Sequence, residues 1–191
     1  MSVQPKLRIS PEEYLELERH SATRSEYLDG EIFATTGGSF RHNIIVGNLV
    51  GELRQQLKGR ACMVAPSDLR IHLPATGLYT YPDVVAICGE PRFKDEEFDT
   101  LLNPTLLIEV LSPTTEAYDR GKKFEHYDTI ESLAEYVLVS QDTPRVEQYV
   151  RQDGGRWLFT ATSGLDAKLV LPSISCELAL AEIYDKVPFG T

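Results

Sequence analysis

An apolar run from Thr105 to Leu111 stands between two prolines and contains a single carboxylate, Glu109. The length of this run and its flanking prolines predict a buried β-strand rather than a helix. Side chains alternate along a strand, so Glu109 should share its face with Leu107 and Leu111. A carboxylate in a buried strand loses its hydration and must be paired, bound to a metal ion or neutralised. The fold of this chain must therefore bring a partner to Glu109.

A second carboxylate, Asp83, follows Pro82 and precedes another apolar segment, residues 84–87. This pattern predicts a second central strand with Asp83 at its start. If the two strands are neighbours, Asp83 and Glu109 can face the same point. Paired carboxylate oxygens in a partly buried site are typical ligands of Mg²⁺ or Mn²⁺. The alternative for Asp83 is an ordinary acidic residue in a turn.

A helix predicted just after the Glu109 strand places Asp119, Lys123 and Tyr127 at intervals of four residues, roughly on one face. Because this helix begins beyond the C-terminal end of the strand, Lys123 can return its ammonium toward Glu109. A cation at that point could orient a nucleophile and counter the charge of a transition state. The alternative is a structural ion pair, in which Lys123 or Arg120 neutralises Glu109.

Composition and charge narrow the class of protein. Hydrophobic residues make up 42% and charged residues 25% of the chain, which predicts one globular domain over residues 1–191. No apolar run is long enough for a membrane span, and the N-terminal segment carries no export signal, so we expect a cytoplasmic protein without a membrane partner. The formal net charge of −10 disfavours proteins that bind nucleic acid mainly through its phosphates.

The three cysteines, Cys62, Cys88 and Cys176, are odd in number and far apart in the sequence. This spacing favours reduced thiols over a disulfide framework or a zinc site. The four histidines also lack the spacing typical of zinc ligands.

The remaining elements follow from local signals. Helices are expected to open at Ser10 and to span about 42–58, 118–130 and 178–184; strands are expected over 62–65, 68–73, 136–140 and near 169; hairpins are expected over 25–34 and 146–162. The strands 62–65 and 68–73 should lie around a turn, and the acidic segment 90–103 should be a solvated loop. Strand 136–140 should pair in parallel with the Glu109 strand through a crossover helix. This order predicts an α/β or α+β domain with a mixed sheet covered by helices.

Four segments occur in one order along the chain: Tyr81-Pro-Asp-Val-Val85, Leu107-Ile-Glu-Val-Leu-Ser-Pro-Thr-Thr115, Asp119-Arg-Gly-Lys-Lys-Phe-Glu-His-Tyr127 and Glu135-Tyr-Val-Leu-Val139. This order resembles the Uma-two family, a group of bacterial restriction-endonuclease-like proteins. The likeness continues upstream in the segment 26–32 and in His42, so it covers nearly the whole chain. It implies the restriction-endonuclease-like PD-(D/E)XK nuclease fold, a mixed central β-sheet flanked by helices, and a homodimer.

In that fold the motif is Pro-Asp followed by acid-any-lysine on the next strand. This sequence has Asp83 and Glu109 at the acidic positions, but Leu111 occupies the lysine position. The resemblance implies that the lysine has migrated to the following helix, where Lys123 is the matching residue and Lys122 the fallback.

Two further residues match family positions near the site. For Glu26 the resemblance implies a role as a metal ligand or as a ligand of metal-bound water, with an exposed acid beside a turn as the alternative. His42 could contact a phosphate or shuttle a proton, and a capping or structural histidine is the alternative. Ser112 and Asp119 could orient Lys123 or cap the start of its helix.

Two functions fit these residues. The first is a Mg²⁺- or Mn²⁺-dependent nuclease that hydrolyses DNA, in which Asp83 and Glu109 bind the metal, Glu26 assists, and Lys123 positions water and stabilises the phosphate. The second is a catalytically silent binding or scaffold protein on the same fold, in which Glu109 and Lys123 form a buried ion pair. The net charge and the missing strand lysine motivate the second. The sequence shows no aromatic-plus-basic cluster of the kind that binds a nucleic acid strand.

Overall fold

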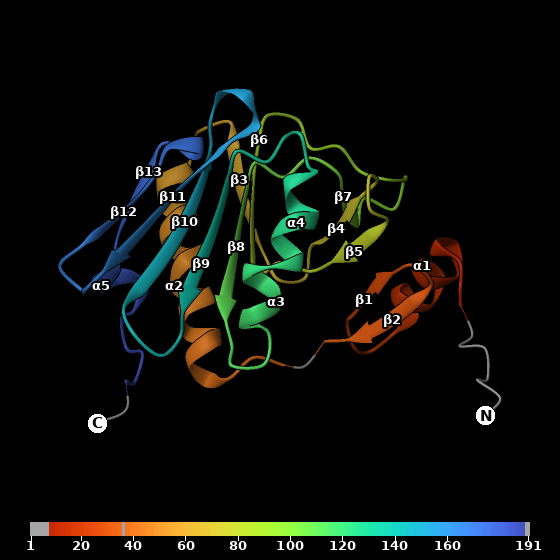
Figure 1. Ribbon diagram of the computed structural model, residues 1–191, viewed down its shortest axis with the longest axis horizontal. Coiled ribbons are helices and arrows are strands. Elements are labelled where there is room, and N and C mark those ends of the chain that lie inside the picture. The colour runs from red at the N-terminus through yellow and green to blue at the C-terminus, as the bar shows by residue number, and fades with distance from the viewer. Residues whose placement is uncertain (1–7, 36, 190–191) are drawn as a thin grey trace.

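The protein forms helices and strands along most of its length (Figure 1). The structure, a computed structural model, describes residues 8–35 and 37–189. Its helices are α1 (Pro11–His20), α2 (Phe40–Leu57), α3 (Glu116–Arg120), α4 (Lys122–Asp128) and α5 (Leu180–Ile183), with 3₁₀ turns at Asp153–Gly155 and Pro172–Ile174. Its strands are β1 (Ser25–Leu28), β2 (Glu31–Ala34), β3 (Cys62–Pro66), β4 (Arg70–Leu73), β5 (Leu78–Thr80), β6 (Val84–Cys88), β7 (Thr100–Leu101), β8 (Leu106–Leu111), β9 (Glu135–Ser140), β10 (Arg145–Arg151), β11 (Trp157–Ser163), β12 (Lys168–Leu171) and β13 (Cys176–Ala179).

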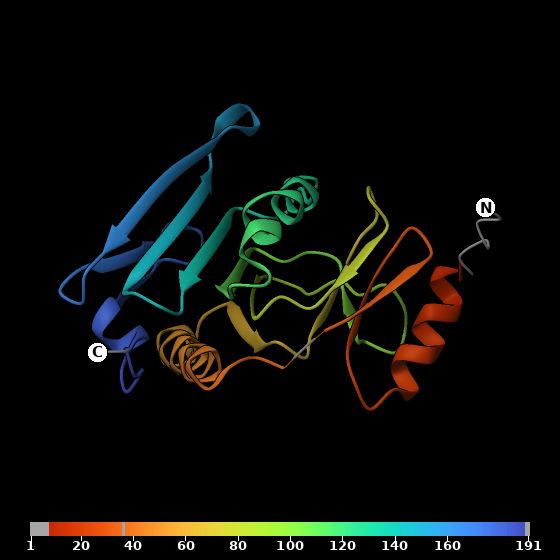
Figure 2. The same cartoon turned by 60° about the horizontal axis from the view of Figure 1, so that its bottom comes forward.

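The strands form three sheets. A six-stranded sheet has the order β11-β10-β9-β8-β6-β3, a five-stranded sheet has the order β2-β1-β5-β4-β7, and β12 pairs with β13. In the six-stranded sheet, β8 is antiparallel to β6 and parallel to β9. Helix α2 lies on one face of this sheet, and α3 and α4 lie on the other (Figure 2). The predicted fold class, a mixed sheet flanked by helices, is confirmed.

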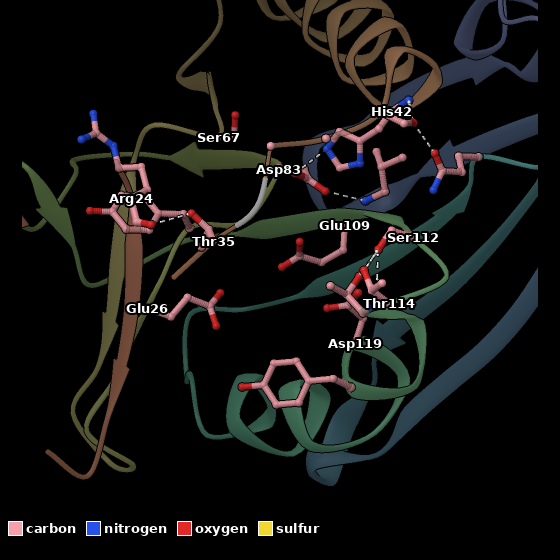
Figure 3. A pocket seen from close by; sticks show the side chains of 18 of the residues that line it. Arg24, Glu26, Thr35, His42, Ser67, Asp83, Glu109, Ser112, Thr114 and Asp119 are labelled. Atoms are coloured by element: carbon pink, nitrogen blue, oxygen red, sulfur yellow. Dashed lines mark hydrogen bonds and ion pairs between the residues drawn. The ribbon is translucent and has the colours of Figure 1, made fainter. Parts of the chain in front are cut away.

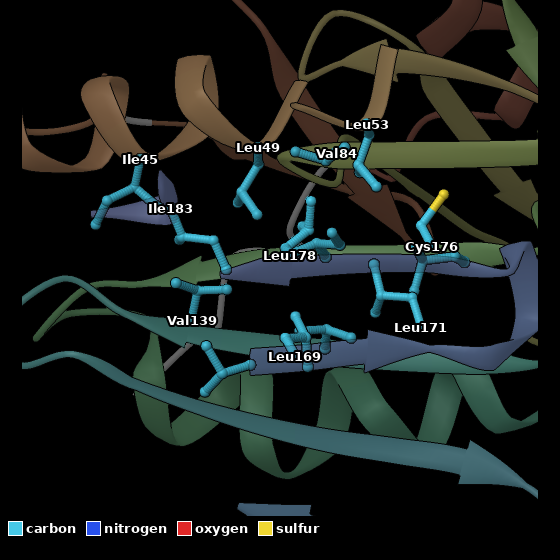
Figure 4. Packing of buried hydrophobic residues seen from close by; sticks show 14 of the residues in the cluster. Ile45, Leu49, Leu53, Val84, Val139, Leu169, Leu171, Cys176, Leu178 and Ile183 are labelled. Carbon is cyan, nitrogen blue, oxygen red and sulfur yellow. The ribbon is translucent and has the colours of Figure 1, made fainter. Parts of the chain in front are cut away.

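Alternation along β8 divides the buried side chains between two cores. On one face, Leu106, Ile108 and Val110 pack in a cluster with α2, β12, β13 and α5 (Figure 4). On the other face, Leu107 and Leu111 pack in a cluster that includes residues of α4 and β9. Since both faces of β8 are buried, the strand is apolar throughout except for Glu109, as the sequence indicated.

The expected helix over 118–130 is two short helices, and the prediction of one continuous helix is wrong. Gly121 separates α3 from α4 with φ −111° and ψ −100°, outside the helical region. Glycine is among the weakest helix formers, because its backbone loses the most conformational freedom in a helix. Asp119, Lys123 and Tyr127 are nevertheless all buried, as expected for residues on a common face.

Two expectations about the middle of the chain also need correction. The strands 62–66 and 70–73 do not form a hairpin, because β3 pairs with β6 while β4 pairs with β5 and β7 in the other sheet. The acidic segment 90–103 is not simply solvated. It contributes β7, and Asp99 pairs with Arg19 at 2.8 Å and with the buried Arg70 at 2.8 Å.

The expectation of reduced thiols is wrong for two of the three cysteines. Cys62 and Cys88 form a disulfide that joins β3 to β6, where the two residues are direct antiparallel partners. The remaining thiol, Cys176, is free and buried. The pairing could not be read from a separation of 26 residues, because β3 pairs with a strand that is not its neighbour in sequence. Within residues 8–35 and 37–189, no helix is long and apolar enough to span a bilayer.

Reducing the Cys62–Cys88 disulfide should lower the free energy of unfolding by about 2–4 kcal/mol, because the cross-link restricts the unfolded chain. Urea unfolding of the oxidised and the reduced protein measures this difference. The control is the double variant Cys62→Ser/Cys88→Ser, whose stability should not respond to the reductant. An equal response of the control would show that the reductant acts elsewhere.

Candidate functional site

A pocket of about 590 Å³ lies where the two larger sheets meet (Figure 3). Its walls come from the β1–β2 hairpin, the start of α2, the C-terminal end of β8 and the helices α3 and α4. Seven of the nine residues predicted for the site line it: Glu26, His42, Asp83, Glu109, Ser112, Asp119 and Lys123. The two that do not are Lys122, which is exposed, and Tyr127, which is buried behind Glu109.

Asp83 lies at the start of β6, opposite Glu109 on β8. The antiparallel register pairs Val84 with Ile108. Asp83, which directly precedes β6, therefore faces Glu109. The backbone N–H of Val110 donates to Asp83 Oδ2 at 2.7 Å. This bond fixes the carboxylate at the edge of the pocket.

His42 contacts the other oxygen of this carboxylate. Its Nε2 lies 3.0 Å from Asp83 Oδ1, and both side chains are about 15% exposed. Burial lowers the pKa of His42, but the hydrogen bond and the charge of Asp83 raise it by more, so its pKa lies above the ordinary value. His42 also stands in the first turn of α2, whose N-cap is Ser39 rather than His42 itself.

Glu109 is held by two donors that reach the same oxygen. Lys123 Nζ lies 2.9 Å from Glu109 Oε1, and the hydroxyl of Tyr127 donates to that oxygen at 2.7 Å. The side chains of Glu109 and Lys123 are only 5% and 7% exposed. Burial, together with the charges of Asp83 and Asp119, outweighs the attraction of Lys123 and raises the pKa of Glu109 to about 8. The helix lysine therefore reaches the strand carboxylate, as the sequence suggested.

Lys123 is surrounded by carboxylates. Besides Glu109, its ammonium lies 3.5 Å from Glu26 Oε1 and 3.6 Å from Asp119 Oδ1. Burial lowers the pKa of Lys123, but these three negative groups together raise it well above the ordinary value. Glu26 in turn accepts a short hydrogen bond from the hydroxyl of Thr80 on the neighbouring strand β5. The ammonium is therefore charged at neutral pH and held from three sides.

Asp119 and Ser112 differ in what they contact. Burial raises the pKa of Asp119, which faces Lys123. Ser112 instead organises the loop before α3, because its hydroxyl lies 3.0 Å from those of Thr114 and Thr115 and accepts the N–H of Thr115 at 3.2 Å.

Several side chains that line the pocket were not predicted from the sequence, among them Arg24, Phe33 and Tyr118. Phe33 is the direct cross-strand partner of Glu26 in the β1–β2 hairpin, so the two side chains share a face. The tight turn at Asp29–Gly30 gives the signal that could have found it, because a two-residue turn fixes the register of its hairpin.

The pocket carries an excess of negative charge. Five acidic side chains line it: Glu26, Asp68, Asp83, Glu109 and Asp119. Among the described residues, only two lysine or arginine side chains line it, Arg24 and Lys123.

Carboxylate oxygens are the ligands that Mg²⁺ and Mn²⁺ prefer. Each oxygen of Asp83 has one hydrogen-bond partner and keeps a second lone pair. Lys123 and Tyr127 both contact Oε1 of Glu109, which leaves its Oε2 for a cation. The donor set thus fits a hard divalent cation held by Asp83 and Glu109. In the part of the chain that the structure describes, no three side chains of His, Cys, Asp or Glu are already gathered as a metal-binding group.

Known proteins resemble this chain over most of its length. The family model Uma2, described as "Putative restriction endonuclease", matches residues 11–181. Two uncharacterized proteins of Synechocystis are similar. The protein slr1290 is 40% identical over 182 residues, which cover 95% of this chain and 94% of slr1290. The protein sll1609 is 36% identical over 157 residues, which cover 82% of this chain and 89% of sll1609. The crystal structure of "a putative nuclease belonging to DUF820" from Anabaena variabilis has the same fold, with a TM-score of 0.73, 22% identity and coverage of 92% of this chain and 97% of that one. The chain belongs to the Uma-two family of restriction-endonuclease-like proteins.

Proposed function

We propose that the protein is a Mg²⁺- or Mn²⁺-dependent nuclease that hydrolyses phosphodiester bonds in DNA. The observation that carries this proposal is the position of Lys123, whose ammonium lies 2.9 Å from Glu109 in a pocket that also holds Asp83. An acid at the start of one strand, an acid on the next strand and a lysine beside it make up the set of groups that the family motif requires. The family to which the chain belongs supports the same activity.

Asp83 and Glu109 would hold the cation, which in such a site polarises a phosphoryl oxygen and lowers the pKa of a bound water. Lys123 stays protonated among its carboxylates, so its ammonium can orient the attacking water and stabilise the added charge on the phosphate. Glu26 and Asp119 position that ammonium from two sides. His42 and the N–H of Val110 keep Asp83 turned toward the pocket.

A catalytically silent scaffold remains the competing function, and a specific observation favours it. Lys123 and Tyr127 both bind Glu109 in a buried network, so the carboxyl group has partners without a metal ion. A network of this kind can persist for the stability or uniqueness of a fold alone.

Millimolar Mn²⁺ should raise the melting temperature of the wild-type protein and should not raise that of Asp83→Ala. Binding to the folded state alone stabilises it by about 2.7 kcal/mol at a metal concentration a hundred times the Kd. The matched control is Asp166→Ala, which removes an exposed carboxylate outside the pocket and should keep the response. Cleavage of labelled DNA with Mg²⁺ and with a chelator then tests the reaction. The absence of any rise in the wild type would favour the scaffold.

A further inference from the structure

We propose that the pocket takes an unpaired stretch of DNA, with one nucleobase stacked on Phe33, and excludes an uninterrupted duplex. This inference rests on the proposed nuclease function for its choice of ligand. Three features of the molecule carry it: the depth of the reacting groups, the position of Phe33 and the charge of the chain.

The groups that would act on a phosphate lie deep. The side chains of Glu109 and Lys123 are 5% and 7% exposed, so a phosphate must enter the pocket to reach them. Glu26 of the hairpin and Asp119 of α3 line the pocket from different sides (Figure 3). The pocket, with a volume of about 590 Å³, is too small to hold both strands of a duplex, whose major groove alone is about 12 Å wide. A single nucleotide can enter such a space, as it does in enzymes that extrude a nucleotide from its duplex.

Phe33 offers a stacking surface at the pocket. It is 48% exposed, lines the pocket and lies on the same face of the hairpin as Glu26. Each nucleobase has a π face, and stacking on an aromatic ring is a common way to bind single strands without sequence preference. Arg24 and Tyr118 line the same pocket from two other segments. The guanidinium of Arg24 lies 3.5 Å from Asp68, and a backbone phosphate of the same strand would take the place of that carboxylate. The fold thus brings an aromatic ring and a cation to one pocket.

The charge of the chain points the same way. Binding to a duplex depends mainly on phosphate contacts by lysine and arginine. This chain has a formal net charge of −10, and acidic side chains outnumber lysine and arginine side chains in the pocket. Because phosphate contacts are few, stacking must supply much of the binding free energy. Stacking requires bases that are not already stacked in a helix, and the ligand is therefore unpaired.

The test compares a labelled oligonucleotide, free and annealed to its complement, by fluorescence anisotropy in the presence of a chelator. The wild type should bind the single strand more tightly than the duplex, with a shallow dependence on salt. Phe33→Ala should weaken binding of the single strand by about tenfold, and Phe33→Trp should retain it. The matched control is Ile32→Ala, because Ile32 is the adjacent residue of β2, is 44% exposed and points away from the pocket. A thermal melt confirms that each variant is folded.

Each outcome of this test separates the two proposals. Equal or tighter binding of the duplex, no binding of either DNA, or no effect of Phe33→Ala would overturn the inference. If Mg²⁺-dependent cleavage occurs with duplex preferred, the inference fails while the nuclease function stands. If the single strand binds through Phe33 and no metal produces cleavage, the nuclease function fails and the ligand assignment stands.

Discussion

Replacing Lys123 with methionine should lower the free energy of unfolding by about 3–5 kcal/mol, because the change removes one partner of a buried ion pair and leaves the other uncompensated. The ammonium is the common partner of Glu26, Glu109 and Asp119. Without it, these carboxylates repel one another at a site where little of their surface is exposed to water. The loss should be largest in alkaline buffer and smaller as the pH falls, because the pKa of Glu109 is raised to about 8 and protonation removes its charge. Urea unfolding in alkaline and in mildly acidic buffer measures both effects.

The matched control for this prediction is the neighbouring residue. Lys122→Met makes the same chemical change one position earlier on α4, where the side chain is exposed and outside the pocket. Its stability should stay within about 0.5 kcal/mol of the wild type, as is usual for surface substitutions. If the two variants lose the same stability, the ion pair seen in the structure does not contribute to folding.

The double variant Lys123→Met/Glu109→Gln should recover most of the stability lost by Lys123→Met and should still lack cleavage activity. Removing both charges of a buried pair is often close to neutral, whereas removing one is costly. Glutamine keeps an acceptor for the hydroxyl of Tyr127, which would otherwise be left unpaired. Activity should fall by at least about 10²-fold, since the ammonium and one metal-binding carboxylate are both gone.

This double variant separates folding from catalysis, because its stability should recover relative to Lys123→Met while its cleavage activity should not. Urea unfolding gives the coupling free energy of the two positions, and cleavage of labelled single-stranded DNA gives the activity. A double variant that cleaves DNA as fast as the wild type would rule out catalysis by this pair. Additive losses of stability would show that the two side chains are not coupled.

The elements that could be predicted from the sequence are those set by local patterns. The apolar run around Glu109 and the Pro82-Asp83 start of its neighbour are strands β8 and β6, and these strands pair. The spacing of Asp119 and Lys123 correctly placed the ammonium near Glu109, because residues four apart share a helix face and the helix directly follows the strand.

What could not be predicted depends on which distant segments meet. The disulfide Cys62–Cys88 requires that β3 cross to the six-stranded sheet, and nothing in its own residues indicates that partner. Phe33 has no distinguishing sequence pattern in its short strand, and it lines the pocket only because the fold brings the hairpin, β8 and α3 together there. The break at Gly121 was the exception, because its residue type alone was a sign of a weakened helix.

The position of the lysine on a helix affects how proteins of this kind are found in genomes. A search that requires acid-any-lysine within one strand fails at Leu111, which is buried in the core, and rejects this chain. A spatial template made of two carboxylates and one ammonium, with the sequence separation left free, would retain it, because Lys123 Nζ lies 2.9 Å from Glu109. If the proposed function holds, a census based on strand patterns would undercount this arrangement, and it would omit any relatives that carry the cation on another element.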